Sequence, residues 1–516
     1  MKKILLLAAA FMLLTAHAWA QTPIAGSNLT WKLEGGILTI SGTGAMPDFD
    51  VNEDINPPWY ANRNSVTAIV VENGVTSIGD WAFFNCTNVI SAQIPTGVKS
   101  MGFIAFGYCY KLKDITIPGS VKSLGIAVFN YCQALETITI PDEVTDISES
   151  LFDSCENLTT VTILGSVKSI GGFAFSSCFK LNNFIIPEDV EIIGEFAFQE
   201  CKALTTINIP ASVATIAIEV FNLCSSLASI TVDVGNNTYS SDGGVLFNKT
   251  KTELLVYPGG GNANYTIPEN VTGIGTSAFF SNEALTSVVI PNNVANIGEK
   301  AFGFCSGLNS ITILRLTPAS VVSAPNTKAT FRNANQNCTV TVPTSAVDVY
   351  KATPGWNYFT NIVGGGLLVV AASNNNEYGN ISGTGLYTIG TAAILTATAN
   401  EGFKFKNWTD DDGNTVSTDA SYNFTPDTDI KLTANFEIST GTSIDNTQIS
   451  KAFIYPSDKK IIIRDAEIGS RLLIVDVSGR ILVNTTITTS ETVIPVGNSG
   501  VYIVKINTQT AKISCK

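Results

Sequence analysis

Cysteine is the residue whose spacing in this chain most strongly suggests a chemical role. Eight of the ten cysteines recur on a 23-residue period, with Asn282 taking the position after one longer unit: Cys86, Cys109, Cys132, Cys155, Cys178, Cys201, Cys224 and Cys305. Stacked thiolates could bind zinc, and exported proteins use disulfides. Neighbouring Cα atoms about 4.8 Å apart would suit a disulfide, but parallel Cα–Cβ bonds hold the Cβ atoms beyond the ~3.8 Å it requires. Since no Cys-x-x-Cys pair occurs, the pattern predicts buried free thiols that pack as small apolar residues.

Catalytic and metal chemistry lack their usual side chains. The one histidine, His17, lies within a segment that we interpret as a signal peptide, so a Ser–His relay, a Cys–His relay or a histidine-bearing metal triad cannot form. Asp142, Glu143 and Asp189 fall in variable loop positions and are interpreted as solvated turn residues. Residues 410–414 resemble a calcium loop but lack the EF-hand order, which favours a hairpin turn. The sequence therefore predicts a protein that is not an enzyme and needs no metal or cofactor.

Aromatic residues outside the repeat core are the candidate partner-binding residues. Tyr108 and Tyr131 share one position of adjacent units, Tyr110 follows close by, and a further position carries three rings: Trp81, Phe173 and Phe196. Contiguous exposed apolar groups mark interaction sites more often than isolated ones do. We hypothesise that Tyr108, Tyr110 and Tyr131 form part of a protein-binding patch. In the alternative interpretation, these rings fold back onto the flank of the molecule.

A repeating unit positions all of these residues. Phenylalanine keeps the 23-residue period at Phe83, Phe106, Phe129, Phe152, Phe175, Phe198, Phe221, Phe279 and Phe302. An apolar residue, mostly isoleucine followed by proline, keeps it at Val71, Ile94, Ile117, Ile140, Ile163, Ile186, Ile209, Val232, Ile267, Ile290 and Ile313. A fixed period of 20 to 50 residues is typical of a solenoid whose units bury their apolar faces against their neighbours.

Each unit is expected to form a coil of defined parts. Alternation in Ile138-Thr139-Ile140 predicts a half-buried strand that Pro141 ends, and Val144 and Ile147 predict a second short extended segment. A short helical turn should follow, with its Phe, Cys and Leu pointing inward. About eleven coils, stacked at about 4.8 Å, would give a body on the order of 50 Å long.

One unit, from Val232 to Ile267, is longer than the others. Residues 243–247 and 253–257 flank a polar turn and predict a hairpin that projects from the coil. A tolerated surface insertion is favoured over a dedicated binding element, because insertions in repeats map to loops on one face.

The fold class is mainly β: a solenoid followed by two small all-β modules. We expect a signal peptide over 1–20, an N-terminal cap over 21–65, the repeat solenoid over 66–316, and a C-terminal cap over 317–365. A small β module around Trp408 spans 366–438, and a C-terminal β module with its linker spans 439–516. The signal peptide predicts export.

Charge and composition exclude several classes of protein. Hydrophobic residues make up 45% of the chain and charged residues 14%, which excludes a disordered chain. The net charge of −13 argues against nucleic acid and anionic membranes as partners, because both require clustered Lys and Arg.

The repeat resembles the BspA-like (Treponema pallidum type) leucine-rich repeat, whose pattern is LxxIxIPxxVxxIGxxAFxxCxxL. The resemblance covers residues 66–316, where nine units keep the Phe position. Residues 366–438 resemble the Listeria–Bacteroides type repeat through Gly402-Phe403 and Trp408. The last module resembles the type IX secretion sorting domain of the Bacteroidetes through Tyr455-Pro456, residues 476–480 and residues 500–505, with Ser457-Asp458 where that family has Asn-Pro.

These resemblances imply a bacterial cell-surface protein, exported by the type IX machinery and either attached to the surface or released. They imply an adhesin that binds a host matrix protein or a partner cell through its solenoid. Two alternatives remain at this point: a glycan-binding surface protein for nutrient capture, and a structural surface protein that associates only with itself.

Overall fold

The computed structural model describes residues 22–24, 27–323, 328–400, 403–438, 447–449, 452–457, 460–496, 500–507 and 509–515. The expected signal peptide, the expected linker over 439–446, and the motif residues Gly402 and Asp458 lie outside the described residues. The chain divides into two compact units, Met1–Gly364 and Gly365–Lys516.

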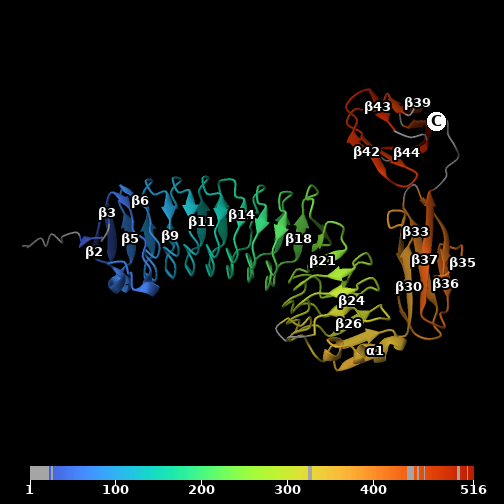
Figure 1. Ribbon diagram of the computed structural model, residues 1–516, viewed down its shortest axis with the longest axis horizontal. Helices are drawn as coiled ribbons and strands as arrows, with labels where there is room; N and C mark the ends of the chain where they lie inside the picture. Colours follow the sequence, from blue (N-terminus) through green and yellow to red (C-terminus); the bar gives the residue numbers. More distant parts are fainter. Residues whose placement is uncertain are drawn as a thin grey trace, which may run out of the picture. The chain divides into compact units, whose positions relative to one another are not determined.

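The first unit is a β-solenoid of about 13 turns built on the 23-residue repeat, as the sequence predicts (Figure 1). The strands along the isoleucine ladder pair in parallel with equivalent strands of adjacent coils, in a row that is interrupted after residues 115, 163 and 232. They are β5 (Ala68–Val71), β7 (Ser91–Gln93), β9 (Asp114–Ile115), β11 (Thr137–Ile140), β13 (Thr160–Ile163), β16 (Thr206–Ile209), β18 (Ser229–Val232), β22 (Asn264–Thr266), β24 (Ser287–Ile290) and β26 (Ser310–Ile313).

A second row of short parallel strands follows the ladder residue in most coils. It consists of β6 (Val75–Ser77), β8 (Ser100–Met101), β10 (Ser123–Leu124), β12 (Asp146–Ile147), β14 (Ser169–Ile170), β15 (Ile192–Ile193), β17 (Thr215–Ile216), β23 (Gly273–Ile274), β25 (Asn296–Ile297) and β27 (Ser320–Val321). These strands pair in sheets such as β12-β14-β15-β17, which ends at β17.

The coil containing Ile186 forms no strand at that residue, in contrast to its neighbours. Phe184 takes the inward position that Ile138 and Ile207 take elsewhere, and its ring packs 4.8 Å from the ring of Phe175 and 5.0 Å from that of Phe198.

The segment predicted as a short helical turn is instead a run of tight turns. In residues 103–111, Ile104 and Tyr108 adopt left-handed conformations, with φ of 52° and 61°. The N–H groups of Ile104, Phe106 and Tyr108 donate to carbonyls of the next coil at 2.9, 2.9 and 2.8 Å. A helix would direct these N–H groups within its own segment, so the stacking of coils favours the turn. We call these nine-residue segments (80–88, 103–111 and their equivalents) the turn segments, and the side of the solenoid that they form the turn flank.

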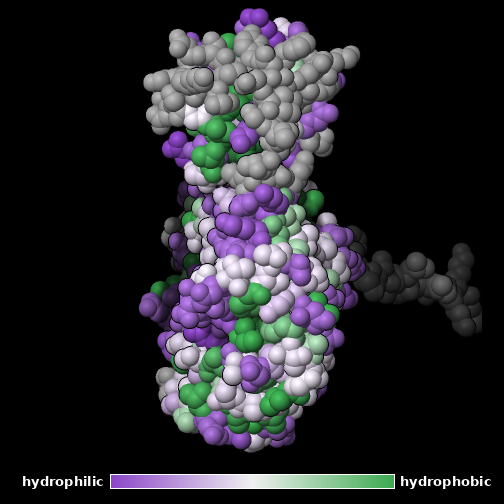
Figure 2. Space-filling model, turned by 90° about the vertical axis from the view of Figure 1, so that its right-hand side faces the viewer, coloured by the Kyte–Doolittle hydropathy of each residue, from purple (hydrophilic) through white to green (hydrophobic). Residues whose placement is uncertain are grey.

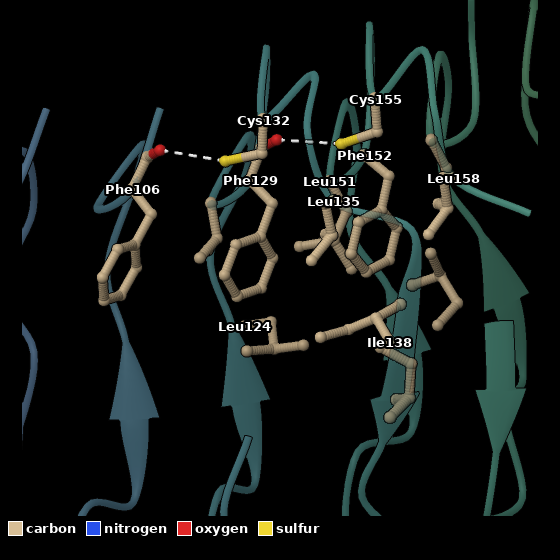
Figure 3. Packing of buried hydrophobic residues seen from close by; sticks show 14 of the residues in the cluster. Phe106, Leu124, Phe129, Cys132, Leu135, Ile138, Leu151, Phe152, Cys155 and Leu158 are labelled. Carbon is tan, nitrogen blue, oxygen red and sulfur yellow. Dashed lines mark hydrogen bonds between the residues drawn. The ribbon is translucent and has the colours of Figure 1, made fainter. Parts of the chain in front are cut away.

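The core contains two stacks of phenylalanine rings, from Phe83 to Phe221 and from Phe279 to Phe331. The rings of Phe129 and Phe152 lie 5.7 Å apart at 3°, and those of Phe152 and Phe175 lie 5.6 Å apart at 15°. Figure 3 shows part of the first stack with the cysteines beside it. Each ring is buried by its neighbours, which is why one unit alone could not fold.

Indole rings cover the outer ends of the two stacks. Near the N-terminus, β1 (Thr22–Pro23), β2 (Leu29–Glu34) and β3 (Ile37–Gly42) precede Trp59, whose ring stacks 5.8 Å from that of Phe83. At the other end, β28 (Thr339–Val342), α1 (Val347–Ala352) and β29 (Asn361–Gly364) enclose Trp356. Strands β3, β28 and β29 pair in parallel with the repeat strands, so the turns outnumber the eleven expected from the ladder.

The long unit contains the predicted antiparallel hairpin, but the prediction that this hairpin projects from the coil as a surface insertion is wrong. Strand β20 (Val245–Asn248) pairs with both β19 (Tyr239–Asp242) and β21 (Glu253–Val256), and Leu246, Phe247 and Leu254 are fully buried. The core divides here into two hydrophobic clusters, and the row of coils changes direction (Figure 1).

The second unit contains two β modules with separate cores. In the first, β30 (Leu367–Ser373), β32 (Gly385–Tyr387), β34 (Phe403–Thr409), β35 (Thr415–Ser417) and β37 (Ile430–Ile438) form one sheet, and β31 (Gly379–Ser382), β33 (Ala393–Ala399) and β36 (Ser421–Phe424) form another. Trp408 is fully buried in this module, and its Nε1 donates to the Asp419 carbonyl at 3.0 Å.

The last module consists of two four-stranded antiparallel sheets. One contains β38 (Thr447–Ile449), β39 (Ala452–Ser457), β40 (Lys460–Arg464) and β43 (Glu491–Pro495). The other contains β41 (Arg471–Asp476), β42 (Ile481–Thr486), β44 (Gly500–Ile506) and β45 (Gln509–Cys515). Residues 476–480 form the turn between β41 and β42, where the Asp476 carboxylate accepts hydrogen bonds from the N–H groups of Ser478 and Arg480.

Candidate functional site

The turn flank brings the three tyrosines of the predicted patch together. The rings of Tyr108 and Tyr131 stack 4.6 Å apart at 17°, and the ring of Tyr110 meets that of Tyr108 edge-on at 6.0 Å. All three side chains are partly exposed. The rings therefore contact one another along the solenoid while each keeps part of its surface open to solvent.

Trp81 joins this group through Phe84 and also contacts Phe103, and the sequence did not single out either phenylalanine. The ring of Phe84 lies 4.6 Å from that of Trp81 and 5.4 Å from that of Tyr108. Phe103 lies 5.4 Å from Trp81 and is 38% exposed. We call the connected group of six rings the aromatic row: Trp81, Phe84, Phe103, Tyr108, Tyr110 and Tyr131. Phe84 and Phe103 could have been predicted from their positions in turn segments 80–88 and 103–111, because these segments also contain the candidate rings Trp81, Tyr108 and Tyr110.

Phe173 and Phe196 do not extend the aromatic row. Their rings stack on each other at 4.8 Å and 23°, and no ring contact among the described residues joins them to Tyr131. The coil between the two groups carries Ser150 and Ser154 at the positions that Ala127 and Tyr131 occupy one coil earlier. The six candidate residues therefore form two separate groups of rings.

Left-handed backbone conformations position several of these rings. Trp81, Tyr108, Tyr131, Phe173 and Phe196 have φ between 56° and 61°, a region that bulky residues seldom adopt. The hydrogen bonds between coils hold the backbone there, such as Tyr131 N–H to the Asp153 carbonyl at 2.8 Å. The same geometry turns the side chains away from the core and onto the flank.

Carboxylates lie at the two ends of the aromatic row, in its first turn segment and in the segment that follows its last ring. Turn segments 80–88, 103–111, 126–134 and 149–157 contain four acidic residues (Asp80, Glu149, Asp153 and Glu156) and one basic residue, Lys111, a formal charge of −3. Burial raises the pKa of Asp80 and of Asp153, although hydrogen bonds from Phe103 N–H and from Asn130 lower it. Lys111 Nζ donates to Asn88 Oδ1 at 2.9 Å.

The hydroxyl of Tyr108 is harder to ionise than that of a free tyrosine. Burial first, and then the neighbouring Tyr131 and Tyr110, raise the pKa of Tyr108. The ring of Tyr108 therefore presents an electron-rich face without a charge of its own at neutral pH. On the face that Figure 2 views, hydrophilic and hydrophobic residues are interspersed.

The cysteine ladder lies in the core, away from this surface. Its eight cysteines are buried free thiols, and they differ from simple apolar residues in one respect. Cys132 Sγ lies 3.3 Å from the Phe106 carbonyl and Cys155 Sγ lies 3.2 Å from the Phe129 carbonyl, so each thiol donates to the preceding coil (Figure 3). Burial raises the pKa of Cys86, Cys224 and Cys305 to about 12.

The remaining candidates lie in solvated turns. Asp142 and Glu143 are exposed, Glu143 pairs with Lys122 at 3.1 Å, and Asp189 pairs with Lys168 at 3.5 Å. A hydrogen bond from Ser166 lowers the pKa of Asp189.

The acidic residues 410–414 connect β34 to β35. The Asp410 carboxylate accepts from Asn414 N–H at 2.8 Å, as in a hairpin turn. Within the described parts of the chain, no three His, Cys, Asp or Glu residues are grouped so as to hold a metal ion. The described helices are also too short to traverse a lipid bilayer.

Several solved structures are similar to the solenoid. A leucine rich cell surface protein from Faecalibacterium prausnitzii is 24% identical, over 67% of this chain and 95% of that chain, with a TM-score of 0.43. A leucine-rich repeat protein from Bacteroides ovatus is 24% identical, over 67% of this chain and 81% of that chain, with a TM-score of 0.37. The pneumococcal vaccine antigen PcpA is 17% identical, over 66% of this chain and 98% of that chain, with a TM-score of 0.36. No curated protein matches the chain.

Two protein families match the sequence. Residues 369–440 match the divergent InlB B-repeat domain, in the module built around Trp408. The BspA type leucine rich repeat region matches in six copies, over residues 53–178, 145–260 and 261–352, which is more than half of the chain. The repeat unit, the parallel coils and this match agree, and the chain belongs to the BspA type leucine-rich repeat family.

Proposed function

We propose that this chain is a non-enzymatic bacterial surface protein that binds an extracellular protein through the turn flank of its solenoid. Leucine-rich repeat proteins generally act in protein–protein interaction, and their solenoids are typically not enzymes. The observation that carries the proposal is the aromatic row, because its six rings contact one another and each keeps part of its surface exposed, and contiguous exposed apolar groups mark interaction sites. Such rings commonly anchor protein partners.

The partner that we propose is a host matrix protein or a protein on another cell, so the chain would act as an adhesin. Export by a signal peptide over 1–20 would place the solenoid outside the cell, and the last module would serve as the type IX sorting domain. Support for this part comes from the signal-peptide pattern and from the motifs around Tyr455-Pro456 and residues 476–480.

The proposal can be tested with substitutions that the fold already accepts. Serine occupies the Tyr131 position one coil later, as Ser154 with φ of 61°, and glutamine occupies the Tyr110 position one coil later, as Gln133. The variant Tyr108→Ser, Tyr110→Gln, Tyr131→Ser should therefore fold while it loses the row. We expect the full chain to capture a protein ligand from a panel of matrix proteins, and the variant to lose that capture.

A matched control changes the strand side of neighbouring coils. Thr116, Thr139 and Thr162 are exposed outward residues of those coils, and the variant Thr116→Ala, Thr139→Ala, Thr162→Ala should retain the ligand. Equal capture by the tyrosine variant would contradict a role for the row. Binding to a glycan array without any protein ligand would instead indicate nutrient capture, and concentration-dependent self-association alone would indicate a structural role.

A further inference from the structure

On the turn flank, aromatic rings outside the aromatic row are covered by cations of the chain itself. Lys202 Nζ lies 4.4 Å from the ring centre of Phe179, and Lys300 Nζ lies 5.8 Å from that of Phe280. The Arg332 guanidinium lies 5.2 Å from the ring centre of Phe304. Cations at these distances are attracted to the electron-rich face of a ring.

Each covered ring has a counterpart in the aromatic row at the same position of the unit. Phe179 corresponds to Tyr110, Phe280 to Phe84, and Phe304 to Tyr108. The same three positions of the unit therefore carry aromatic rings in both places. Outside the row a cation of the chain lies above each of these rings, whereas none of the described cations lies above a ring of the row.

The positions that supply the cations carry uncharged residues in the coils of the row. Lys202 corresponds to Gln133 and Lys300 to Ile104, by the same offsets along the sequence. Arg332 corresponds to Asn130, since its carbonyl accepts from Phe304 N–H as the Asn130 carbonyl accepts from Tyr108 N–H. Over the described residues, no lysine or arginine lies over a ring of the row.

The charge around the row favours a cation from outside. The three turn segments that hold its rings carry one carboxylate, Asp80, and one lysine, Lys111, whose ammonium group is bonded to Asn88. The next segment, 149–157, adds three carboxylates beside the Tyr131 end of the row: Glu149, Asp153 and Glu156. Carboxylates at the rim attract a cationic partner and orient it, while the ring faces supply the contact.

We propose that the aromatic row binds the guanidinium and ammonium groups of an extended, Arg- and Lys-rich segment of a partner protein. This inference rests on the proposed function and specifies the chemistry of the partner. The partner's cations would lie above the rings of the row. Lys202, Lys300 and Arg332 lie in the same way above the equivalent rings elsewhere on the flank.

The test uses the full chain and three fluorescent peptides of equal length, in which glycine alternates with arginine, lysine or glutamine. We expect the arginine peptide to bind most tightly, the lysine peptide less tightly, and the glutamine peptide not at all, by fluorescence anisotropy at low salt. The variant Tyr108→Leu, Tyr131→Leu keeps apolar bulk but removes two electron-rich faces, and should weaken arginine-peptide binding about tenfold.

Two further variants separate the row from general effects on the surface. Phe304→Leu removes a ring that Arg332 already covers and should leave peptide binding unchanged. Gln133→Lys places a cation beside Tyr110 as Lys202 is placed beside Phe179, and should compete with the peptide and weaken its binding. Circular dichroism of each variant checks that the solenoid is intact.

The outcomes distinguish this inference from the proposed function. Equal binding of the glutamine peptide, equal binding by the Tyr108→Leu, Tyr131→Leu variant, or tight binding of a neutral oligosaccharide to the row would overturn the cation inference. A protein ligand that depends on the tyrosines but is not displaced by the arginine peptide would overturn it while the proposed function stands. Peptide binding at the row, with no protein ligand that depends on it, would overturn the proposed function instead.

Discussion

At the scale of single residues, the cysteine of each coil does more than fill space. From Cys109 onward its thiol donates to the Phe carbonyl of the preceding coil, and that carbonyl also accepts a turn hydrogen bond, as Phe106 does from Cys109 N–H. Asn282, which replaces cysteine in one coil, also donates to the preceding coil, through Nδ2 to the Pro258 carbonyl at 3.1 Å. The position therefore requires a small side chain that can donate a hydrogen bond, which explains why cysteine suits it better than alanine.

Ionisation of these thiols makes the solenoid sensitive to base. Burial raises the folded-state pKa of Cys86, Cys224 and Cys305 from 9.0 to about 12, so above pH 9.0 the unfolded thiols lose protons that the folded ones keep. The stabilisation is complete below pH 9.0 and is lost as the pH rises toward 12. Urea denaturation at increasing pH should show a falling midpoint over this range. Rapid alkylation of the native thiols at neutral pH would contradict their burial.

At the scale of the elements, the turn segments contain strained backbone conformations, and hydrogen bonds between stacked coils hold the backbone in them. Left-handed residues that are not glycine recur twice in most coils, for example Ser150 and Ser154 with φ of 54° and 61°. A side chain in this conformation costs about 1 to 2 kcal/mol. The bond from Ser150 N–H to the Gly172 carbonyl, at 2.9 Å, shows what holds it in place.

Glycine at such a position should stabilise the solenoid. Ser150→Gly removes the steric cost at φ of 54°, and we expect the free energy of unfolding to rise by up to about 1 kcal/mol. The same change in a strand, Ser123→Gly in β10, should instead lower it by about 0.5 to 1 kcal/mol. Denaturant titration of the two variants measures the difference. A loss of stability in both would show that Ser150 is not strained.

At the scale of the whole solenoid, stability depends on shielding the outer ends of the ring stacks. Trp59 is 1% exposed, stacks on Phe83, and donates from Nε1 to the Ala82 carbonyl at 2.8 Å. Trp356 is fully buried at the other end and donates from Nε1 to the Ala319 carbonyl at 2.9 Å. In a linear array, removal of a cap exposes the coil beside it first.

Replacing an end ring should therefore cause unfolding from that end. Trp59→Ala should cost about 3 to 5 kcal/mol, because it opens a cavity against Phe83 and removes a buried hydrogen bond. Amide hydrogen exchange should show that protection is lost first in the coils beside Trp59, over residues 66–110. The control Trp356→Ala should move the loss to the coils before residue 321. Uniform loss of protection in both variants would indicate a single cooperative unit.

The sequence by itself determined the repeat and everything that follows from it. Equivalent residues of a solenoid stack, so the 23-residue period predicts the parallel strands, the phenylalanine core and the row of inward cysteines. The stacking of Tyr108 on Tyr131 follows in the same way, because the two residues share one position of adjacent coils.

Only the tertiary structure decided how different positions of the unit meet. Trp81 reaches Tyr108 through Phe84, and this contact depends on left-handed turns that the sequence led us to expect as helical. The burial of the long unit was equally unpredictable, because alternating apolar residues such as Leu246 and Leu254 suit either a projecting hairpin or a buried one. A period determines contacts between like positions, whereas contacts between unlike positions depend on where the backbone turns in space.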